Sequence, residues 1–322
     1  MHIYSYQLTL QKWNWLRIFM EVLKKQRTIA VIITAIIVLS TIGWYVWDTN
    51  RERLILATTT STYDSGLLDE LVPKFESQYH VYVDIISVGT GQAIATAEAG
   101  DADVVLVHSK SAELAFVNVG HGYHRIGVMY NDFVIVGPTT DPANIRGLSN
   151  VTEAFIRISN CGNQGECVFL SRGDNSGTHN KEVSVWTDAG IEPSADWYLE
   201  AGQGMGTTIQ MANEEQAYTL ADRGTWLSYK TDVTLEVLTE GDLILLNPYG
   251  VIPVNPEKHS NVKNQLAIKF VQYLISTETQ QMIGDFKKEG EVLFKPIARD
   301  VSQCINLGFP NQAQELSWYD SQ

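Results

Sequence analysis

Strand-like and helix-like patterns alternate along most of this 322-residue chain, and this alternation constrains its fold more than any other feature. Apolar or alternating runs typical of strands occupy 54–57, 81–88 and 103–107. Apolar residues at helical spacing lie between them, at 67–75 and 92–99. Strands that alternate with helices predict an α/β fold, in which helices cover both faces of a parallel or mixed sheet.

The alternation continues through the rest of the chain. Later patterns predict strands at 133–136, 168–170 and 243–246 and helices at 151–158, 181–189, 207–222, 261–276 and 277–286. Two of the strands lie in apolar runs bounded by Pro, Gly and Asn, at 131–138 and 243–256. If the chain leaves one lobe through the first run and returns through the second, the two runs form a two-strand hinge. We therefore expect one lobe from 53–136 plus 251–322, a second lobe from 137–250, and a cleft between them.

The first 50 residues have a different character from the body. Thr28 to Trp47 contains 20 residues without a charge, which is long enough for a helix to cross a bilayer. Five basic residues and one acid precede it, so the positive-inside rule predicts a cytoplasmic segment at 1–27, a transmembrane anchor at 28–47, and an extracytoplasmic body. The alternative is a cleaved signal peptide.

Charge and cysteine content limit the partners. The formal net charge of −14 disfavours nucleic acid, which needs a basic face, but local donors can still bind a small anion. Cys161 and Cys167 bracket a short loop and form either a disulfide outside the cell or two free thiols, which leaves Cys304 unpaired. No Cys/His spacing resembles a metal site.

Four junctions between elements share one design. Small and hydroxyl residues precede or open a predicted helix at 58–61 (TTTS), 89–92 (GTGQ), 171–179 (SRGDNSGTH) and 202–208 (GQGMGTT). Backbone N–H groups are unpaired at a helix start, Gly lets the backbone approach a ligand, and Ser and Thr add O–H donors. One such junction is most often only a helix cap, but four together predict a site for an anion.

Arg172 is the one fixed cation in these four loops. Its guanidinium can present two parallel donors to the oxygens of an oxyanion. The alternative is an ion pair with Asp174, and the two interpretations are compatible, because Asp174 could orient Arg172 toward the ligand.

The order TTTS, GTGQA, SRGDNSGTH resembles the tungstate-binding protein of ABC-type importers, which has a two-lobe periplasmic-binding-protein-like fold of type II. The similarity covers roughly residues 53–298, including NDFVIVGP, GMGTT and NPYGVIPVNP. It implies no cofactor, an ABC permease and its ATPase as partners, and a monomeric binding protein. The CGNQGEC loop and the N-terminal anchor depart from the pattern. The resemblance implies that the following residues bind the oxyanion: Thr59, Thr60, Ser61, Thr90, Gly91, Arg172, Ser176, Gly177, Thr178, Met205, Gly206 and Thr207.

Several alternatives remain open from the sequence. Tungstate, molybdate and sulfate offer only acceptors near neutral pH, whereas phosphate keeps a proton and needs a carboxylate such as Asp174. Tungstate and molybdate nearly coincide in size, so only the resemblance favours tungstate. A hydrolase using Ser61 lacks the G-x-S-x-G elbow, so we expect no enzymatic activity. A membrane-anchored anion sensor would need an output domain larger than 27 residues.

Overall fold

The computed structural model describes residues 15, 20–21, 24–27, 31–41, 51–174, 176–194 and 196–322. The chain divides into two compact units, Met1–Glu52 and Arg53–Gln322. In the first unit, 24–27 and 31–41 are helical, and the remainder of the predicted anchor at 28–47 lies outside the described residues. Among the residues that are described, no helix has both the length and the apolarity to span a membrane.

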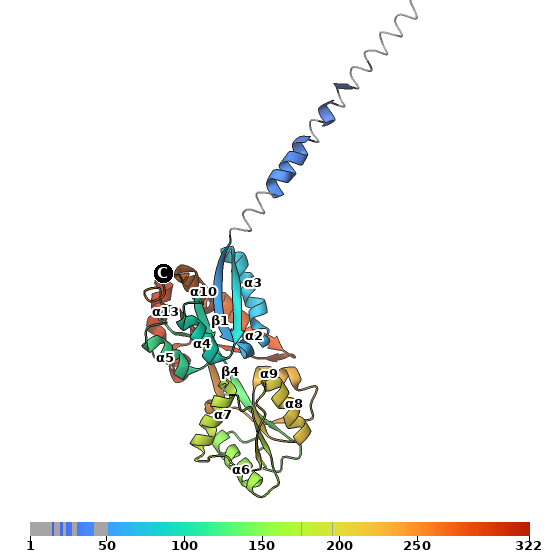
Figure 1. The fold of residues 1–322 in the computed structure, drawn as a ribbon, viewed down its shortest axis with the longest axis vertical. Coiled ribbons are helices and arrows are strands. Elements are labelled where there is room, and N and C mark those ends of the chain that lie inside the picture. Colours follow the sequence, from blue (N-terminus) through green and yellow to red (C-terminus); the bar gives the residue numbers. More distant parts are fainter. Residues whose placement is uncertain are drawn as a thin grey trace, which may run out of the picture. The chain divides into compact units, whose positions relative to one another are not determined.

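One mixed sheet organises the second unit (Figure 1). Its strands follow the order β12-β4-β9-β3-β1-β2, and β7 and β8 pair with β4 off this path. The strands are β1 (Glu52–Thr59), β2 (Val81–Val88), β3 (Val104–Val107), β4 (Ile126–Gly137), β7 (Thr219–Asp222), β8 (Glu236–Thr239), β9 (Leu246–Pro253) and β12 (Lys295–Pro296). Two smaller sheets pair β5 (Phe169–Ser171) with β6 (Tyr198–Glu200) and β10 (Lys287–Lys288) with β11 (Glu291–Val292).

Strand β4 belongs to both lobes. Its first part pairs antiparallel with β9, from Ile126 opposite Val251 to Asp132 opposite Leu246. Its second part pairs with β7, from Phe133 opposite Asp222. The chain therefore leaves the first lobe along β4 and returns along β9, within the two segments predicted as crossings. The lobe boundaries at 136/137 and 250/251 fall inside these strands and remain predictions.

Helices cover the sheet in each lobe (Figure 1). The first lobe carries α2 (Thr60–Asp64), α3 (Leu67–Tyr79), α4 (Thr90–Glu98), α5 (Lys110–Asn118), α10 (Asn264–Ile275), α11 (Thr277–Asp285), α12 (Val301–Asn306) and α13 (Gln312–Ser321). The second carries α6 (Val151–Asn163), α7 (Gly177–Asp188), α8 (Met205–Glu215) and α9 (Arg223–Tyr229), and the short 3-10 helix η1 (Leu243–Leu245) precedes β9.

The second lobe has an aromatic core. The Trp186 ring lies 4.3 Å from Phe155 and 5.2 Å from Phe169, between centroids, and all three side chains are buried. Cys161 and Cys167, at the end of α6, join this core as a disulfide, whereas Cys304 is buried as a free thiol. The lobe thus has its own apolar centre, independent of the cleft.

The C-terminal residues pack back onto the first lobe. Arg125 bonds Glu113 Oε2 through Nε at 2.8 Å and the Gly308 carbonyl through Nη1 at 2.9 Å. Its guanidinium also lies 3.8 Å from the centre of the Phe309 ring. These contacts fasten the segment before α13 to the sheet, and Tyr319 on α13 donates its hydroxyl to the His124 carbonyl.

Three predicted elements were wrong. The predicted strand at 243–246 is the 3-10 helix η1 (Leu243–Leu245), because Asp242 caps it by accepting the Ile244 N–H, and β9 begins only at Leu246. The predicted helix at 207–222 spans most of α8 and all of β7, whose last residue, Asp222, caps α9. Helix α8 ends early because Gln216 adopts a left-handed conformation (φ 50°). Backbone pairing with β4 then makes 219–222 a strand. The predicted helix at 181–189 starts four residues earlier, at Gly177, because Ser176 caps it.

Candidate functional site

Loops from both lobes enclose a cavity of about 630 Å³. Its wall contains residues of three predicted donor loops, together with carboxylates and residues of α9. The lining residues are Thr60, Ser61, Asp64, Ser65, Arg172, Asp174, Gly204, Met205, Gly206, Thr207, Gly224, Thr225, Ser228 and Tyr229. Of the described residues, Arg172 is the one Lys or Arg side chain in this wall.

The residues of the hydroxyl run at the junction of β1 and α2 have two roles. Thr59 ends β1, is buried, and caps α2 by accepting the Thr62 N–H at 3.2 Å. The Thr59 and Thr62 hydroxyl oxygens lie 2.6 Å apart, and the Ser61 hydroxyl oxygen lies 3.1 Å from that of Thr59. Thr60 and Ser61 line the cavity, whereas Thr59 lies behind them and contacts the Ser61 hydroxyl.

The loop between β5 and α7 presents Arg172. Its Nε donates to Asp174 Oδ2 at 2.8 Å, and the Ser176 N–H donates to Asp174 Oδ1 at 3.0 Å. Both side chains are largely covered, with 15% of Arg172 and 25% of Asp174 exposed. Within the described part of the chain, the terminal nitrogens of Arg172 have no hydrogen-bond partner. The two interpretations of Arg172 therefore coexist: Asp174 holds Nε, and the fork remains available to a ligand.

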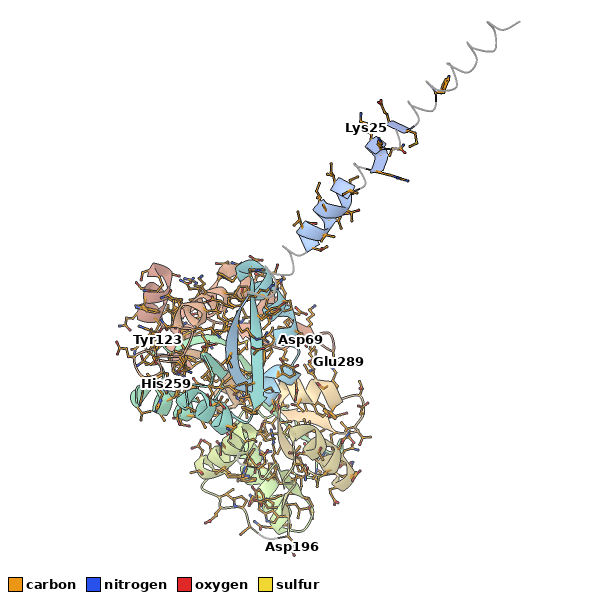
Figure 2. All side chains as sticks on the ribbon, turned by 45° about the horizontal axis from the view of Figure 1, so that its top comes forward. Lys25, Asp69, Tyr123, Asp196, His259 and Glu289 are labelled. Atoms are coloured by element: carbon orange, nitrogen blue, oxygen red, sulfur yellow. A yellow bond between two sulfur atoms is a disulfide. The ribbon has the colours of Figure 1, made fainter. Side chains whose placement is uncertain are left out.

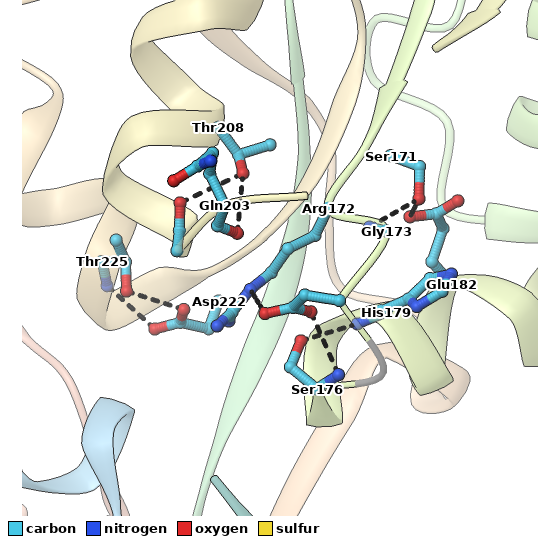
Figure 3. A network of polar contacts seen from close by, with 12 residues as sticks. Ser171, Arg172, Gly173, Ser176, His179, Glu182, Gln203, Thr208, Asp222 and Thr225 are labelled. Atoms are coloured by element: carbon cyan, nitrogen blue, oxygen red, sulfur yellow. Dashed lines mark hydrogen bonds and ion pairs between the residues drawn. The ribbon is translucent and has the colours of Figure 1, made fainter. Parts of the chain in front are cut away.

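A buried carboxyl group supports this loop from behind (Figure 3). Glu182 on α7 accepts from the Ser171 hydroxyl at 2.8 Å, the Trp186 indole at 3.1 Å and the Tyr198 hydroxyl at 2.8 Å. The Ser171 oxygen in turn accepts the Gly173 N–H at 3.2 Å. Burial raises the pKa of Glu182, and its three donors oppose that shift.

The start of α8 contributes backbone donors, because Gly204 caps this helix without a side-chain hydrogen bond. Met205 is buried, whereas Thr207 is exposed to the cavity. At Gly206 a Cβ atom would lie 2.4 Å from the Tyr229 hydroxyl oxygen. Glycine is needed there to fit Tyr229 of α9, whereas the sequence alone suggested space for a ligand.

The remaining predicted residues lie beside this cavity rather than in its wall. A Cβ atom on Gly177 would lie 3.1 Å from His108 Cε1 and 3.8 Å from the Thr90 hydroxyl oxygen, so α7 approaches the first lobe here. Gly91 has open space around it, and Thr178 is buried. Ser176 caps α7 by accepting the His179 N–H at 3.3 Å, which leaves its hydroxyl hydrogen available.

Sequence reasoning missed His108, Asp222 and Thr225. Asp222, buried at the end of β7, accepts the N–H and the hydroxyl of Thr225 at 2.8 and 2.7 Å, and Figure 3 shows Arg172 pointing toward this pair. The D-x-x-T spacing is a helix-capping signal, which the wrong helix at 207–222 concealed. His108 directly follows the buried strand β3, so its position resembles that of the TTTS loop.

Two oppositely charged groups act on His108. Burial, the largest effect, lowers the pKa of its imidazole; Asp222 raises that pKa and Arg172 lowers it. Both charges come from the second lobe, so groups of that lobe act electrostatically on a first-lobe side chain. The site combines one guanidinium, several hydroxyls and backbone N–H groups with the hydrogen-bonded carboxylates of Asp174 and Asp222 and with the carboxylate of Asp64, which also lines the cavity.

Two α/β lobes joined by two crossing strands, with donors gathered in a cavity from both lobes, define a two-lobe binding protein. A model of the PBP superfamily domain matches residues 46–278, and the chain belongs to this superfamily.

Named relatives are similar over most of the chain. The tungstate-binding protein TupA of Peptoclostridium acidaminophilum is 48% identical over 252 residues, which cover 77% of this chain and 87% of the relative. TupA from Desulfovibrio alaskensis G20 has a similar structure, with a TM-score of 0.69 and 45% identity over 76% of this chain and 98% of that one. The tungstate ABC transporter structure from Geobacter sulfurreducens has a TM-score of 0.66 and 50% identity, covering 73% and 99%. These relatives are named as binding and transport proteins and not as enzymes, which agrees with the absence of a hydrolase motif.

Proposed function

We propose that this chain is the extracytoplasmic substrate-binding component of an ABC importer and that it captures tungstate. The observation that carries the proposal is the Arg172 fork, held at Nε by Asp174 and facing a cavity walled by Ser61 and Thr207. Its support from outside the molecule is the 48% identity to a protein named for tungstate binding.

The donor set suits a fully deprotonated tetrahedral anion. Hydroxyls, backbone N–H groups and a guanidinium all donate hydrogen bonds, and tungstate offers only acceptors. Phosphate would need a free acceptor for its proton. Asp174 accepts from Arg172 and from the Ser176 N–H, so its capacity to take a further donor is reduced. The Asp174 arrangement favours tungstate, molybdate or sulfate over phosphate, and the named relatives favour tungstate. Asp64 is the other carboxylate in the cavity wall, so the phosphate titration tests whether it accepts the phosphate proton.

The oxyanion would be held by both lobes. In this proposal, Thr60 and Ser61, supported by Thr59, donate from the first lobe. The second lobe contributes Arg172 with Ser176, and the 205–207 turn. Thr90, Gly91, Gly177 and Thr178 stand at the edge of the site and complete it on closure. A cavity of about 630 Å³ is larger than one tetrahedral oxyanion, so the loops must approach further around a bound ion. Bending of β4 and β9 is the motion that would bring them together.

The importer role requires that the body be outside the cytoplasm and near a permease. We place residues 1–27 in the cytoplasm and the anchor at 28–47 in the membrane, on the charge asymmetry and the uncharged run. The closed, loaded form would then dock on the permease while its ATPase drives transport. A membrane-anchored sensor would share the anion site but would not deliver the anion to a permease.

Isothermal titration calorimetry with four anions tests the proposal. The protein without residues 1–51 is titrated with tungstate, molybdate, sulfate and phosphate at pH 7.5, because Arg53–Gln322 is a compact unit with its own cores. We expect one site per chain, tight binding of tungstate, and phosphate binding weaker by at least about 100-fold, since a phosphate proton facing donors leaves a hydrogen bond unmade. Equal or tighter binding of phosphate would overturn the choice of ligand, and no binding of any anion would overturn the function.

A further inference from the structure

His108 joins the anion loop to the rest of the cleft. Strands β1 and β3 are parallel neighbours, with Thr58 opposite Leu106, so the residues that follow them emerge at the same edge of the sheet. His108 Nε2 lies 3.1 Å from the Ser61 hydroxyl oxygen and 3.2 Å from the Thr59 hydroxyl oxygen. The imidazole therefore contacts the hydroxyl loop without being part of it.

The opposite ring nitrogen contacts the crossing strands. His108 Nδ1 lies 3.0 Å from Asn247 Oδ1 on β9. The Asn247 amide nitrogen donates to Asn131 Oδ1 on β4 at 2.8 Å and lies 3.4 Å from the Tyr249 hydroxyl. Asn131 and Asn247 are directly opposite each other in the β4–β9 ladder. One chain of hydrogen bonds thus runs from Thr59 and Ser61 through the imidazole to both strands of the hinge.

This chain of hydrogen bonds determines the tautomer of His108. Because the Asn247 amide nitrogen faces Asn131, its oxygen faces the ring and can only accept, so Nδ1 carries the hydrogen. Burial lowers the pKa of the imidazole and so favours its neutral form. Nε2 is then a single acceptor and takes one hydroxyl hydrogen from Thr59 or Ser61. That acceptor gives the coupled hydroxyls a fixed direction, because each has only one hydrogen to donate.

The ring also lies close to the opposite lobe. A Cβ atom built on Gly177, the first residue of α7, would lie 3.1 Å from His108 Cε1, so the start of α7 lies near the ring. The Tyr249 ring packs against the imidazole, with centroids 4.8 Å apart. Movement of α7 or of the crossing strands would therefore shift this ring and, with it, the hydroxyl loop.

We infer that His108 is a positioning residue of the anion site: its Nε2 orients the Thr59 and Ser61 hydroxyls, and its Nδ1 ties them to the hinge strands. This inference rests on the proposed function and identifies a residue that acts through the donors without touching the anion. Without the Nε2 acceptor, the hydroxyl hydrogens lose their preferred direction, and ordering them when the anion binds lowers the net binding free energy.

Two amide variants separate the roles of the two nitrogens. In His108→Asn the amide reaches the position of Nδ1, so the contact with Asn247 can remain while the hydroxyl contact is lost. In His108→Gln the amide oxygen can reach the position of Nε2 and accept from the hydroxyls. We expect the tungstate Kd to rise by about tenfold in His108→Asn, the effect of about one hydrogen bond, and by less than about threefold in His108→Gln.

The test is calorimetric titration of the full-length variants with tungstate, with thermal unfolding as the check of folding. The matched control is His121→Asn, since His121 is also partly buried and bonds another side chain, His259. Figure 2 labels His259 in the first lobe, and the tungstate Kd of this variant should not change. Thr59→Val removes a hydroxyl partner of Nε2 and should raise the tungstate Kd by a similar factor. This variant therefore replaces His108→Asn in the test if His108→Asn does not fold. Equal Kd values for His108→Asn and the wild type, or equal losses in the Asn and Gln variants, would overturn the inference. A wild type that binds no tungstate would instead refute the proposed function.

Discussion

Replacement of Arg172 by Ala is the sharpest test of the site. The side chain is the one cation in the cavity wall among the described residues, and its Nε is already held by Asp174. The variant removes the fork and leaves the Asp174 carboxylate without its cationic partner, so an uncompensated negative charge then lies beside the anion. Arg172→Lys keeps the charge but loses the bidentate geometry.

The expected increase in the tungstate Kd of Arg172→Ala follows from the hydrogen bonds that the variant removes. If the two terminal nitrogens each donate one charge-assisted hydrogen bond, worth about 1.5–3 kcal/mol, their loss costs at least about 3 kcal/mol. That corresponds to a Kd increase of more than about 100-fold, and Arg172→Lys should fall near tenfold. The ion pair with Asp174 is partly exposed, so the free energy of unfolding should change by no more than about 1 kcal/mol.

The assay is calorimetric titration with tungstate, alongside urea unfolding. Arg157→Ala provides the control, because Arg157 lies in the same lobe and is ion-paired to Glu153 at 2.8 Å, away from the cavity. We expect no change in its tungstate Kd. If Arg172→Ala binds tungstate as tightly as the wild type while remaining folded, the assignment of the site is wrong.

Three further predictions concern stability. Burial lowers the folded-state pKa of His108 below its usual value of about 6.5, so the unfolded chain binds more protons just below that pH, and the free energy of unfolding should decline on acidification through this window. Urea unfolding at pH 7.5 and 5.5 should show a smaller decline in His108→Gln than in the wild type. Equal declines in the two proteins would contradict this explanation. Gly206→Ala places a Cβ 2.4 Å from the Tyr229 hydroxyl oxygen and should lower the free energy of unfolding by about 1–3 kcal/mol. A Cβ at Gly204 meets nothing within 4 Å, so Gly204→Ala should change that free energy by less than about 0.5 kcal/mol. Thermal and urea unfolding of the two variants measure the difference, and equal stabilities would show that Tyr229 does not restrict the residue at 206. Replacing Cys161 and Cys167 by Ser opens a short loop and should lower the free energy of unfolding, measured in urea without reductant, by about 2 kcal/mol. The tungstate Kd should not change, since neither residue lines the cavity. A changed Kd would reveal coupling between the disulfide and the site.

Local patterns predicted much of the fold. The alternation of strands and helices, the crossing segments and the opening of helices at the GTGQ and SRGDNSGTH loops follow from side-chain periodicity and capping residues, which act within a few positions of the chain. The prediction failed at 207–222, because pairing of β7 with β4 is a long-range interaction that helical spacing cannot reveal. The same error concealed Asp222, which caps α9 beside the cavity.

The sequence by itself determined which loops can donate hydrogen bonds. Glycines and hydroxyls at helix starts have that property wherever the helices lie, and Arg172 has the same charge in any fold. Only the tertiary structure decided which donors meet. The pairing of β1 with β3, of β3 with β9 and of β9 with β4 brings His108 between Ser61 and Asn247, and the packing of the two lobes places Arg172 and Ser61 around one cavity whose wall does not include Thr90 or Gly91. The reason is physical: donor chemistry is a property of single residues, whereas convergence depends on strand pairing between residues more than 100 positions apart in the chain.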